Sequence, residues 1–248
     1  MNAVSDLWDL PFEELRTLAE DGDAAAQHVI GCLCDLEPEG AEQAVQWWRK
    51  AAAQGHAASM NDLGAAYEEG SGVEQDLQHA LMLYHRSAEQ GDCQAMANLG
   101  RMYEYGIGLP ADKVLMVQWY RRAAERNSSE AQNRLGYCYD QGDGVVQNAA
   151  LAAYWYGRAA HLNDSQAQYN LACCYELGVG VPADATLALH WYTKAVESGN
   201  ADAQWRMGVA YRDGDFGLKP DKAEARRLLE LAAAQGFETA IRDLELWT

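Results

Sequence analysis

One short pattern recurs along this chain at an interval of 36 residues. It consists of a Leu-Gly pair, a Tyr three residues after that Gly, and a Gly-x-Gly turn, as in residues 99–108. The glycine position of the pair recurs at Gly64, Gly100, Gly136 and Gly208, with alanine in its place at Ala172, and Gly31 begins a shortened first copy. A fixed period of about 20–50 residues is typical of solenoids, whose stacked repeats share one continuous core.

Each copy predicts two helices. In residues 92–105, Ala95, Leu99 and Met102 fall at helical spacing and give one apolar face. Gly100 lies inside that helix, where a glycine costs about 0.8–1 kcal/mol relative to alanine. Its recurrence indicates that a neighbouring helix passes too close for a side chain. The glycines and Pro110 that follow predict the end of the helix.

The second helix of each of the last five copies begins after a residue of the N-cap type. In three copies it carries a Trp-Tyr pair, as in Trp119-Tyr120, on its predicted buried face. The tyrosines of the first helix, such as Tyr103, are also expected in the core. The predicted N-cap residues are Asp76, Asp112, Asn148, Asp184 and Asp221.

Together these residues resemble the Sel-one-like repeat, a 36-residue relative of the tetratricopeptide repeat. The resemblance covers about 22–236 and implies an all-α, right-handed α/α superhelical solenoid of about six repeats, a fold whose members mostly bind other proteins. We therefore expect a single solenoid over 1–248, with a cap helix in 1–21, six repeats in 22–236 and a closing helix in 237–248. The repeats at the two ends of a solenoid usually depart from the repeat sequence, because one of their faces is exposed to solvent.

Charge and hydropathy narrow the possible partners. The chain has 37 acidic and 19 basic residues, a net charge of −18, which disfavours nucleic acid as a ligand. Residues 1–70 alone contain 14 acidic and 3 basic residues. No apolar run is long enough to span a membrane, and the start of the chain lacks the pattern of a signal peptide, so we expect a cytoplasmic protein.

The sequence shows no pattern that predicts catalysis. There is no His-x-x-x-His pair, no Cys-x-x-Cys and no nucleophile-elbow motif, and the Gly-x-Gly turns lack a strand–turn–helix setting for a dinucleotide. We expect no metal, no cofactor and no enzymatic activity. The six cysteines follow no regular pairing scheme, and Cys138 and Cys174, which share one position of the repeat, are expected to be buried.

Two sets of side chains are candidates for binding a partner. In this class of fold the resemblance implies that the first helices of the repeats line the concave groove. The first set consists of the acidic residues that lie four residues after the glycine position. The second set consists of aromatic residues at positions where the repeat does not require an aromatic. The candidates are Glu68, Glu104, Asp140 and Glu176, and Tyr105, Tyr137, Tyr169 and Trp205.

Both sets have structural alternatives: the acids could bond the adjacent turn, and the aromatics could pack between helices. Our main prediction is a non-catalytic adaptor or scaffold that binds a basic protein or peptide and is a monomer or a weak homo-oligomer. The first alternative is an inhibitor or immunity protein that masks one basic enzyme or toxin, and the second is a small-molecule hydrolase or binder. Trp8 and Trp247 suggest a third, an oligomer packed end to end.

Overall fold

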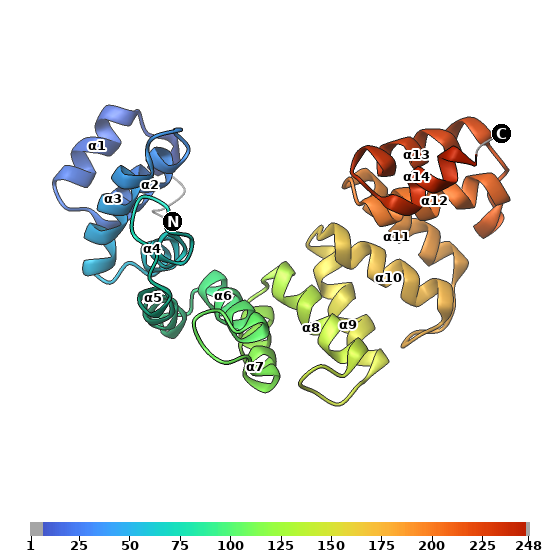
Figure 1. Ribbon diagram of the computed structural model, residues 1–248, viewed down its shortest axis with the longest axis horizontal. Coiled ribbons are helices and arrows are strands. Elements are labelled where there is room, and N and C mark those ends of the chain that lie inside the picture. Colours follow the sequence, from blue (N-terminus) through green and yellow to red (C-terminus); the bar gives the residue numbers. More distant parts are fainter. Residues whose placement is uncertain (1–6, 247–248) are drawn as a thin grey trace. The chain divides into compact units, whose positions relative to one another are not determined.

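The computed structural model describes residues 7–246, in which all regular elements are helices joined by short turns, without strands in that range. The helices group into two compact units, Met1–Arg126 and Asn127–Thr248. In Figure 1 the helices of each unit follow one another in chain order, from α1 to α7 and from α8 to α14. Trp247, which belongs to the predicted closing helix and to the suggested end-to-end contact, lies outside the described residues. The single solenoid over 1–248 stays a prediction.

The first unit contains a leading helix followed by three helix pairs. The leading helix is the predicted N-terminal cap, and each pair is one repeat with a first (A) and a second (B) helix. The elements are η1 (Leu7–Asp9), α1 (Phe12–Glu20), α2 (Ala24–Asp35), α3 (Ala41–Ala53), α4 (Ala57–Glu69), α5 (Leu77–Glu89), α6 (Cys93–Tyr105) and α7 (Lys113–Glu125).

The second unit contains three further pairs and the predicted closing helix. Its elements are α8 (Ser129–Gln141), α9 (Ala149–His161), α10 (Ser165–Leu177), α11 (Ala185–Glu197), α12 (Ala201–Asp213), η2 (Asp215–Gly217), α13 (Lys222–Ala234) and α14 (Glu238–Glu245). The described residues thus contain the 14 α-helices expected from the repeat pattern.

The helix boundaries predicted from caps are confirmed. The first helix of repeats two to six ends at a glycine in the left-handed conformation, as at Gly106, with φ of 70°. Each predicted N-cap residue of repeats two to six accepts a bond from a backbone N–H of its own helix through its side chain, which satisfies a donor left open at a helix start.

The repeated glycine allows a tyrosine of the second helix to pack directly on the backbone of the first. A Cβ added at Gly100 would lie 2.6 Å from Tyr120 Cδ1, and one added at Gly136 would lie 2.7 Å from Tyr156 Cδ1. Atoms this close would overlap. The close helix contact predicted from the sequence is therefore confirmed, and the contacting side chain is the tyrosine of the Trp-Tyr pair.

The burial of the aromatic residues differs from the prediction in two respects. Tyr120 and Tyr156 are buried, but Trp119 and Trp155 beside them are only partly buried, because the helix turns the tyrosine toward the glycine. Tyr103 and its equivalents are also partly buried rather than core. Their backbone carbonyls accept the N–H of the following N-cap residue, so this position closes the connection between the two helices.

The connections and the cysteines agree with the sequence reading. The Gly-x-Gly turns follow helices, as expected for loops rather than for a nucleotide site. All six cysteines lie in the described residues and none forms a disulfide there; Cys138 and Cys174 are buried, as predicted for their shared position. Among the described residues, no helix is both long and apolar enough to cross a membrane.

Gly157 is a helical glycine that packing does not require. It lies in the middle of α9, and a Cβ added there would meet only Leu171 Cδ2, at 3.9 Å. Other repeats place larger side chains at this position, including Arg49, His85 and Glu230. Gly157 instead borders a cavity of about 590 Å³ in the second unit.

Substituting Gly157 with alanine is expected to raise the free energy of unfolding by about 0.5–1 kcal/mol, because alanine favours the helix and meets no neighbour. Urea denaturation followed by circular dichroism measures the change. Gly136→Ala is the matched control, since the same substitution there places a Cβ against Tyr156 and is expected to destabilise. A loss of stability in Gly157→Ala would contradict the conclusion that the space beside Gly157 is open.

Candidate partner-binding surface

The predicted partner-binding residues all lie on A helices, and the four acids lie near the C-terminal ends of those helices. Glu68, Glu104 and Tyr105 belong to the first unit, and the other five to the second. Tyr105 is 59% exposed and Tyr137 is 50% exposed. These two tyrosines present large aromatic surfaces to solvent within their respective units.

The other two aromatics are engaged within the second unit. Tyr169 packs against the core of that unit, with its ring centroid 5.8 Å from that of Tyr192. Burial raises the pKa of the Tyr169 hydroxyl well above its usual value. Trp205 packs beside Phe237, and its Nε1 donates to Asp243 Oδ2 at 2.9 Å. Trp205 therefore joins α12 to the closing helix α14.

Three of the four acids make the same hydrogen bond within their own repeat. Each carboxylate accepts a bond from the hydroxyl of the B-helix tyrosine 16 residues later. The pairs are Tyr84–Glu68 at 2.9 Å, Tyr120–Glu104 at 2.6 Å and Tyr192–Glu176 at 2.5 Å. The same tyrosine thus packs on the glycine with its ring and bonds the acid with its hydroxyl. This bond explains why an acid recurs at a helix C-terminus, where the helix dipole disfavours negative charge.

The fourth acid, Asp140, has a side chain that is one methylene shorter than that of the three glutamates. Its Oδ2 accepts a bond from Gln141 Nε2 at 2.7 Å. Burial raises the pKa of Tyr156, and the charge of the Asp140 carboxylate raises it further. The assignment of the four acids and four aromatics to partner binding stays a prediction.

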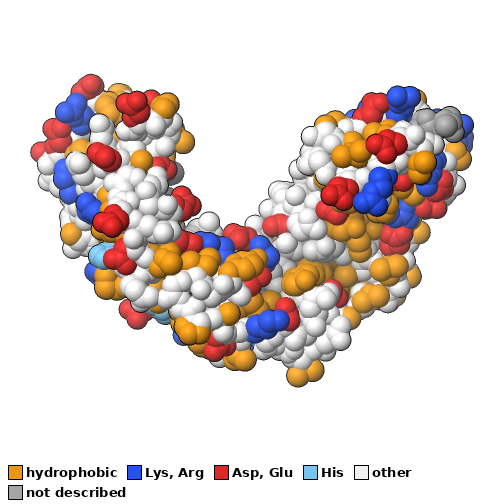
Figure 2. Space-filling model, in the orientation of Figure 1, with side chains coloured by type: hydrophobic (Ala, Val, Ile, Leu, Met, Phe, Trp, Pro, Cys, Tyr) orange, Lys and Arg blue, Asp and Glu red, His pale blue; other side chains and the backbone are white. Residues whose placement is uncertain are grey.

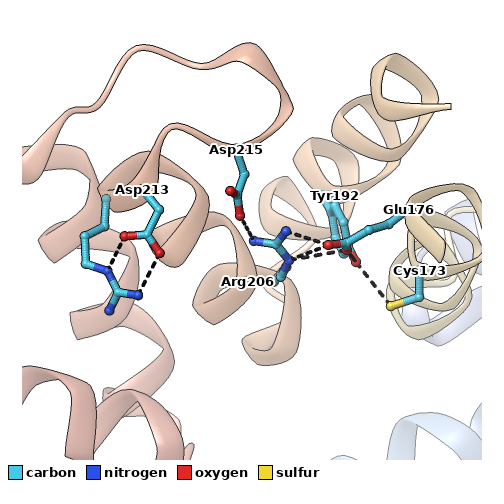
Figure 3. Close-up of polar contacts among 7 residues, drawn as sticks. Cys173, Glu176, Tyr192, Arg206, Asp213 and Asp215 are labelled. Atoms are coloured by element: carbon cyan, nitrogen blue, oxygen red, sulfur yellow. Dashed lines mark hydrogen bonds and ion pairs between the residues drawn. The ribbon is translucent and has the colours of Figure 1, made fainter.

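Glu176 is the centre of the most extensive polar network in Figure 3. Arg206 of α12 contacts both carboxylate oxygens of Glu176, with Nη2–Oε1 at 2.5 Å and Nε–Oε2 at 3.3 Å, and its Nη1 contacts Asp215 Oδ2 at 2.8 Å. Cys173 Sγ lies 3.2 Å from the Tyr192 hydroxyl. Four elements, α10, α11, α12 and η2, meet in this network.

The pKa values of this network follow from its geometry. Burial alone would raise the pKa of Glu176, but the hydrogen bonds from Arg206 and Tyr192 outweigh burial and lower it. Burial raises the pKa of Tyr192, and its neighbours Cys173 and Glu176 raise it further. Glu176 is therefore ionised and Tyr192 neutral at physiological pH, which suits an ion pair and a hydrogen-bond donor rather than an acid–base pair.

Glu68 has a comparable setting in the first unit. Its Oε2 accepts bonds from the Tyr84 hydroxyl and from Arg101 Nη2, the latter at 2.7 Å. Arg101 belongs to the A helix of the next repeat, so the acid connects three helices. Asparagines also join neighbouring A helices. The bonds run from Asn98 Nδ2 to Asn61 Oδ1 at 2.9 Å and from Asn170 Nδ2 to Asn133 Oδ1 at 3.0 Å.

The structure also brings together three side chains that the sequence analysis did not connect. His28 and Cys32 lie one turn apart on α2, and Asp62 approaches them from α4, with 2.8 Å between His28 Nε2 and Asp62 Oδ2. Burial would lower the pKa of His28, but its bonds to Asp62 and Cys32 outweigh burial and raise that pKa to about 9. The search for His-x-x-x-His and Cys-x-x-Cys missed this set because it mixes residue types and spans two helices.

Acidic side chains are widely distributed over the surface. Figure 2 shows them on both units on the face drawn, among hydrophobic and neutral side chains. The strong acidic excess in residues 1–70 falls entirely in the first unit. Such a field accelerates encounters with basic molecules and weakens with added salt.

Comparison with known proteins identifies both the repeat and solved relatives. A Sel1 repeat protein from Oxalobacter formigenes is 36% identical, with a TM-score of 0.75 and 85% of each chain covered. The protective antigen c5321 of uropathogenic Escherichia coli is 33% identical, with a TM-score of 0.79, over 91% of this chain and 49% of that one. The immunity protein Pa5087 of Pseudomonas aeruginosa is 22% identical, with a TM-score of 0.54, over 85% and 81%, a likeness that shows the fold alone.

No curated protein matches the chain. The family model of the Sel1 repeat, the Sel-one-like repeat of the sequence analysis, matches six consecutive segments, each of which covers one A/B helix pair of the structure. They are residues 25–56, 57–92, 93–128, 129–164, 165–200 and 201–237. The chain belongs to the Sel1 repeat family.

Proposed function

We propose that this chain is a non-catalytic interaction module that binds a basic protein or peptide on the exposed side of its A helices. Sel1 repeats generally mediate protein–protein interaction. The observation that carries the proposal for this chain is the exposure of Tyr105 and Tyr137, at A-helix positions where the repeat does not require an aromatic. Tyrosine is enriched among the residues that dominate interface energies.

Charge supports the choice of a basic partner. The chain carries −18 in total, and only 3 of the first 70 residues are basic. Steering by this field predicts an association rate that falls as salt increases. Because Glu68 and Glu176 are already paired with arginines, the attraction would come from the acidic surface as a whole and from unpaired exposed acids.

The proposal predicts that Tyr105→Ala and Tyr137→Ala each weaken partner binding by about 1–2 kcal/mol, roughly 5- to 30-fold in Kd, with unchanged helicity. The partner is first captured with the wild-type chain, eluted in salt steps and identified by mass spectrometry. Its affinity for each variant is then measured by calorimetry. Tyr154→Ala is the control, because Tyr154 is 54% exposed on the B helix α9. Equal losses in all three variants would contradict binding on the A-helix side.

A narrower candidate is an inhibitor or immunity protein that masks one basic enzyme or toxin. The strong negative charge favours it over a general scaffold, and proteins named as immunity proteins adopt the same fold. It predicts one-to-one binding to a single partner, with loss of that partner's activity in the complex. Several partners bound without inhibition would favour the scaffold.

A further inference from the structure

The His28, Cys32 and Asp62 cluster places three different metal-ligand atoms around one point. Cys32 Sγ lies 3.5 Å from His28 Nε2 and 3.7 Å from Asp62 Oδ2, and the nitrogen and oxygen are 2.8 Å apart. His28 and Cys32 share a face because four residues make about one helical turn. Asp62 comes from the A helix of the next repeat.

Two of these three separations are close to those of a tetrahedral zinc site. With Zn–N and Zn–O of about 2.0–2.2 Å and Zn–S of about 2.3 Å, ligand atoms at tetrahedral angles lie about 3.4–3.6 Å apart. The two distances that involve sulfur are already close to that value. The 2.8 Å distance is that of a hydrogen bond, so the carboxylate would move by roughly half an ångström to admit the ion.

The aspartate is also held in the orientation that a ligand requires. Asn61 Nδ2 donates to Asp62 Oδ1 at 3.1 Å, which leaves Oδ2 directed at His28. Asn98 Nδ2 donates in turn to Asn61 Oδ1 at 2.9 Å. Metal ligands in proteins are commonly fixed by hydrogen bonds of this kind, and their loss costs about 10–100-fold in metal affinity.

The site has room for a fourth ligand from solution. Cys32 and Asp62 line a cavity of about 480 Å³ in the first unit, together with Asp35, Glu69 and Trp48. The two further carboxylates favour a cation there. Three protein ligands beside an open space are the arrangement in which zinc keeps a water molecule as its fourth ligand. The mixed nitrogen, sulfur and oxygen set suits zinc and disfavours magnesium and calcium, which prefer oxygen alone.

We propose that His28, Cys32 and Asp62 bind one divalent cation of the zinc class, with the fourth coordination position open to the adjoining cavity. The site joins the A helices of the first two repeats. It is independent of the proposed partner binding through Tyr105 and Tyr137, and it uses none of the residues assigned to that surface.

The test uses the full chain without a histidine tag. After treatment with a chelator and a thiol reductant, zinc is titrated by calorimetry, and cobalt(II) is added in a parallel sample as a spectroscopic probe. We expect one zinc ion per chain with a Kd of about 1 µM or tighter. Cobalt should give the intense thiolate charge-transfer band and the visible bands of a tetrahedral site. Absence of saturable binding at one equivalent would overturn the proposal.

Variants locate the ion. Cys32→Ser should abolish the thiolate band, and Asp62→Asn should weaken zinc binding by about tenfold or more, with little change in side-chain volume. Cys93→Ser is the matched control, because Cys93 is a partly buried cysteine of another A helix outside the cluster. Thermal unfolding without metal verifies that each variant is folded. Equal binding by Cys32→Ser and the wild type would place the ion elsewhere and overturn the proposal.

Discussion

Replacing Gly100 with leucine is expected to destabilise the protein by about 3 kcal/mol, the upper part of the range for overpacked cores. Even a Cβ at this position would lie 2.6 Å from the ring of Tyr120, and that side chain is buried. Tyr120 also donates its hydroxyl to Glu104, so displacing the ring strains a hydrogen bond as well. The helix preference of leucine offsets only about 0.8 kcal/mol.

Chemical denaturation of the variant measures this effect, and Gly157→Leu is its matched control. Both substitutions place leucine in the middle of a helix of a repeat, but the side chain at Gly157 would enter the cavity beside α9. We expect Gly157→Leu to retain or exceed the wild-type stability. Equal losses in the two variants would show that the helix glycines matter for a reason other than the contact with tyrosine.

The repeat made this contact predictable in part. Gly100 and its equivalents indicated that a helix passes close by, because a glycine in a helix is costly unless space demands it. The sequence did not show which neighbour fills the space, since Trp119 and Tyr120 are adjacent and either fits an apolar face. The choice depends on the rotation of the second helix about its axis, which the 36-residue period leaves open.

The role of the acids was harder to predict for a related reason. Glu104 and Tyr120 are 16 residues apart and lie on different helices, so no local spacing connects them. His28 and Asp62 are 34 residues apart and come from neighbouring repeats. By contrast, the N-cap at Asp112 and the helix end at Gly106 follow from the properties of single residues, and both are confirmed. Local rules thus gave the elements, while contacts between helices required the structure.

Replacing Arg206 with alanine is expected to destabilise the protein by about 2–3 kcal/mol. The side chain is only 16% exposed, and it bonds both Glu176 and Asp215 while its guanidinium lies 4.7 Å from the centre of the Phe216 ring. Hydrogen bonds to charged groups contribute about 1.5–3 kcal/mol each, and removing one partner leaves the half-buried Glu176 without its cation. The Tyr192 hydroxyl alone would then stabilise that charge.

Arg212→Ala is the matched control, because Arg212 lies on the same helix and pairs with Asp213 at the protein surface. The side chains of that pair are 40% and 45% exposed, so its loss should cost less than about 1 kcal/mol.

Denaturation of both variants and the wild type at several pH values separates the contribution of packing from that of charge. The folded-state pKa of Glu176 is lowered, so its contribution is complete above the unfolded value of about 4.3 and is lost as pH falls through the folded value. The difference between the wild type and Arg206→Ala should therefore narrow below about pH 4. A difference that is independent of pH would assign the effect to packing against Phe216 rather than to the ion pair.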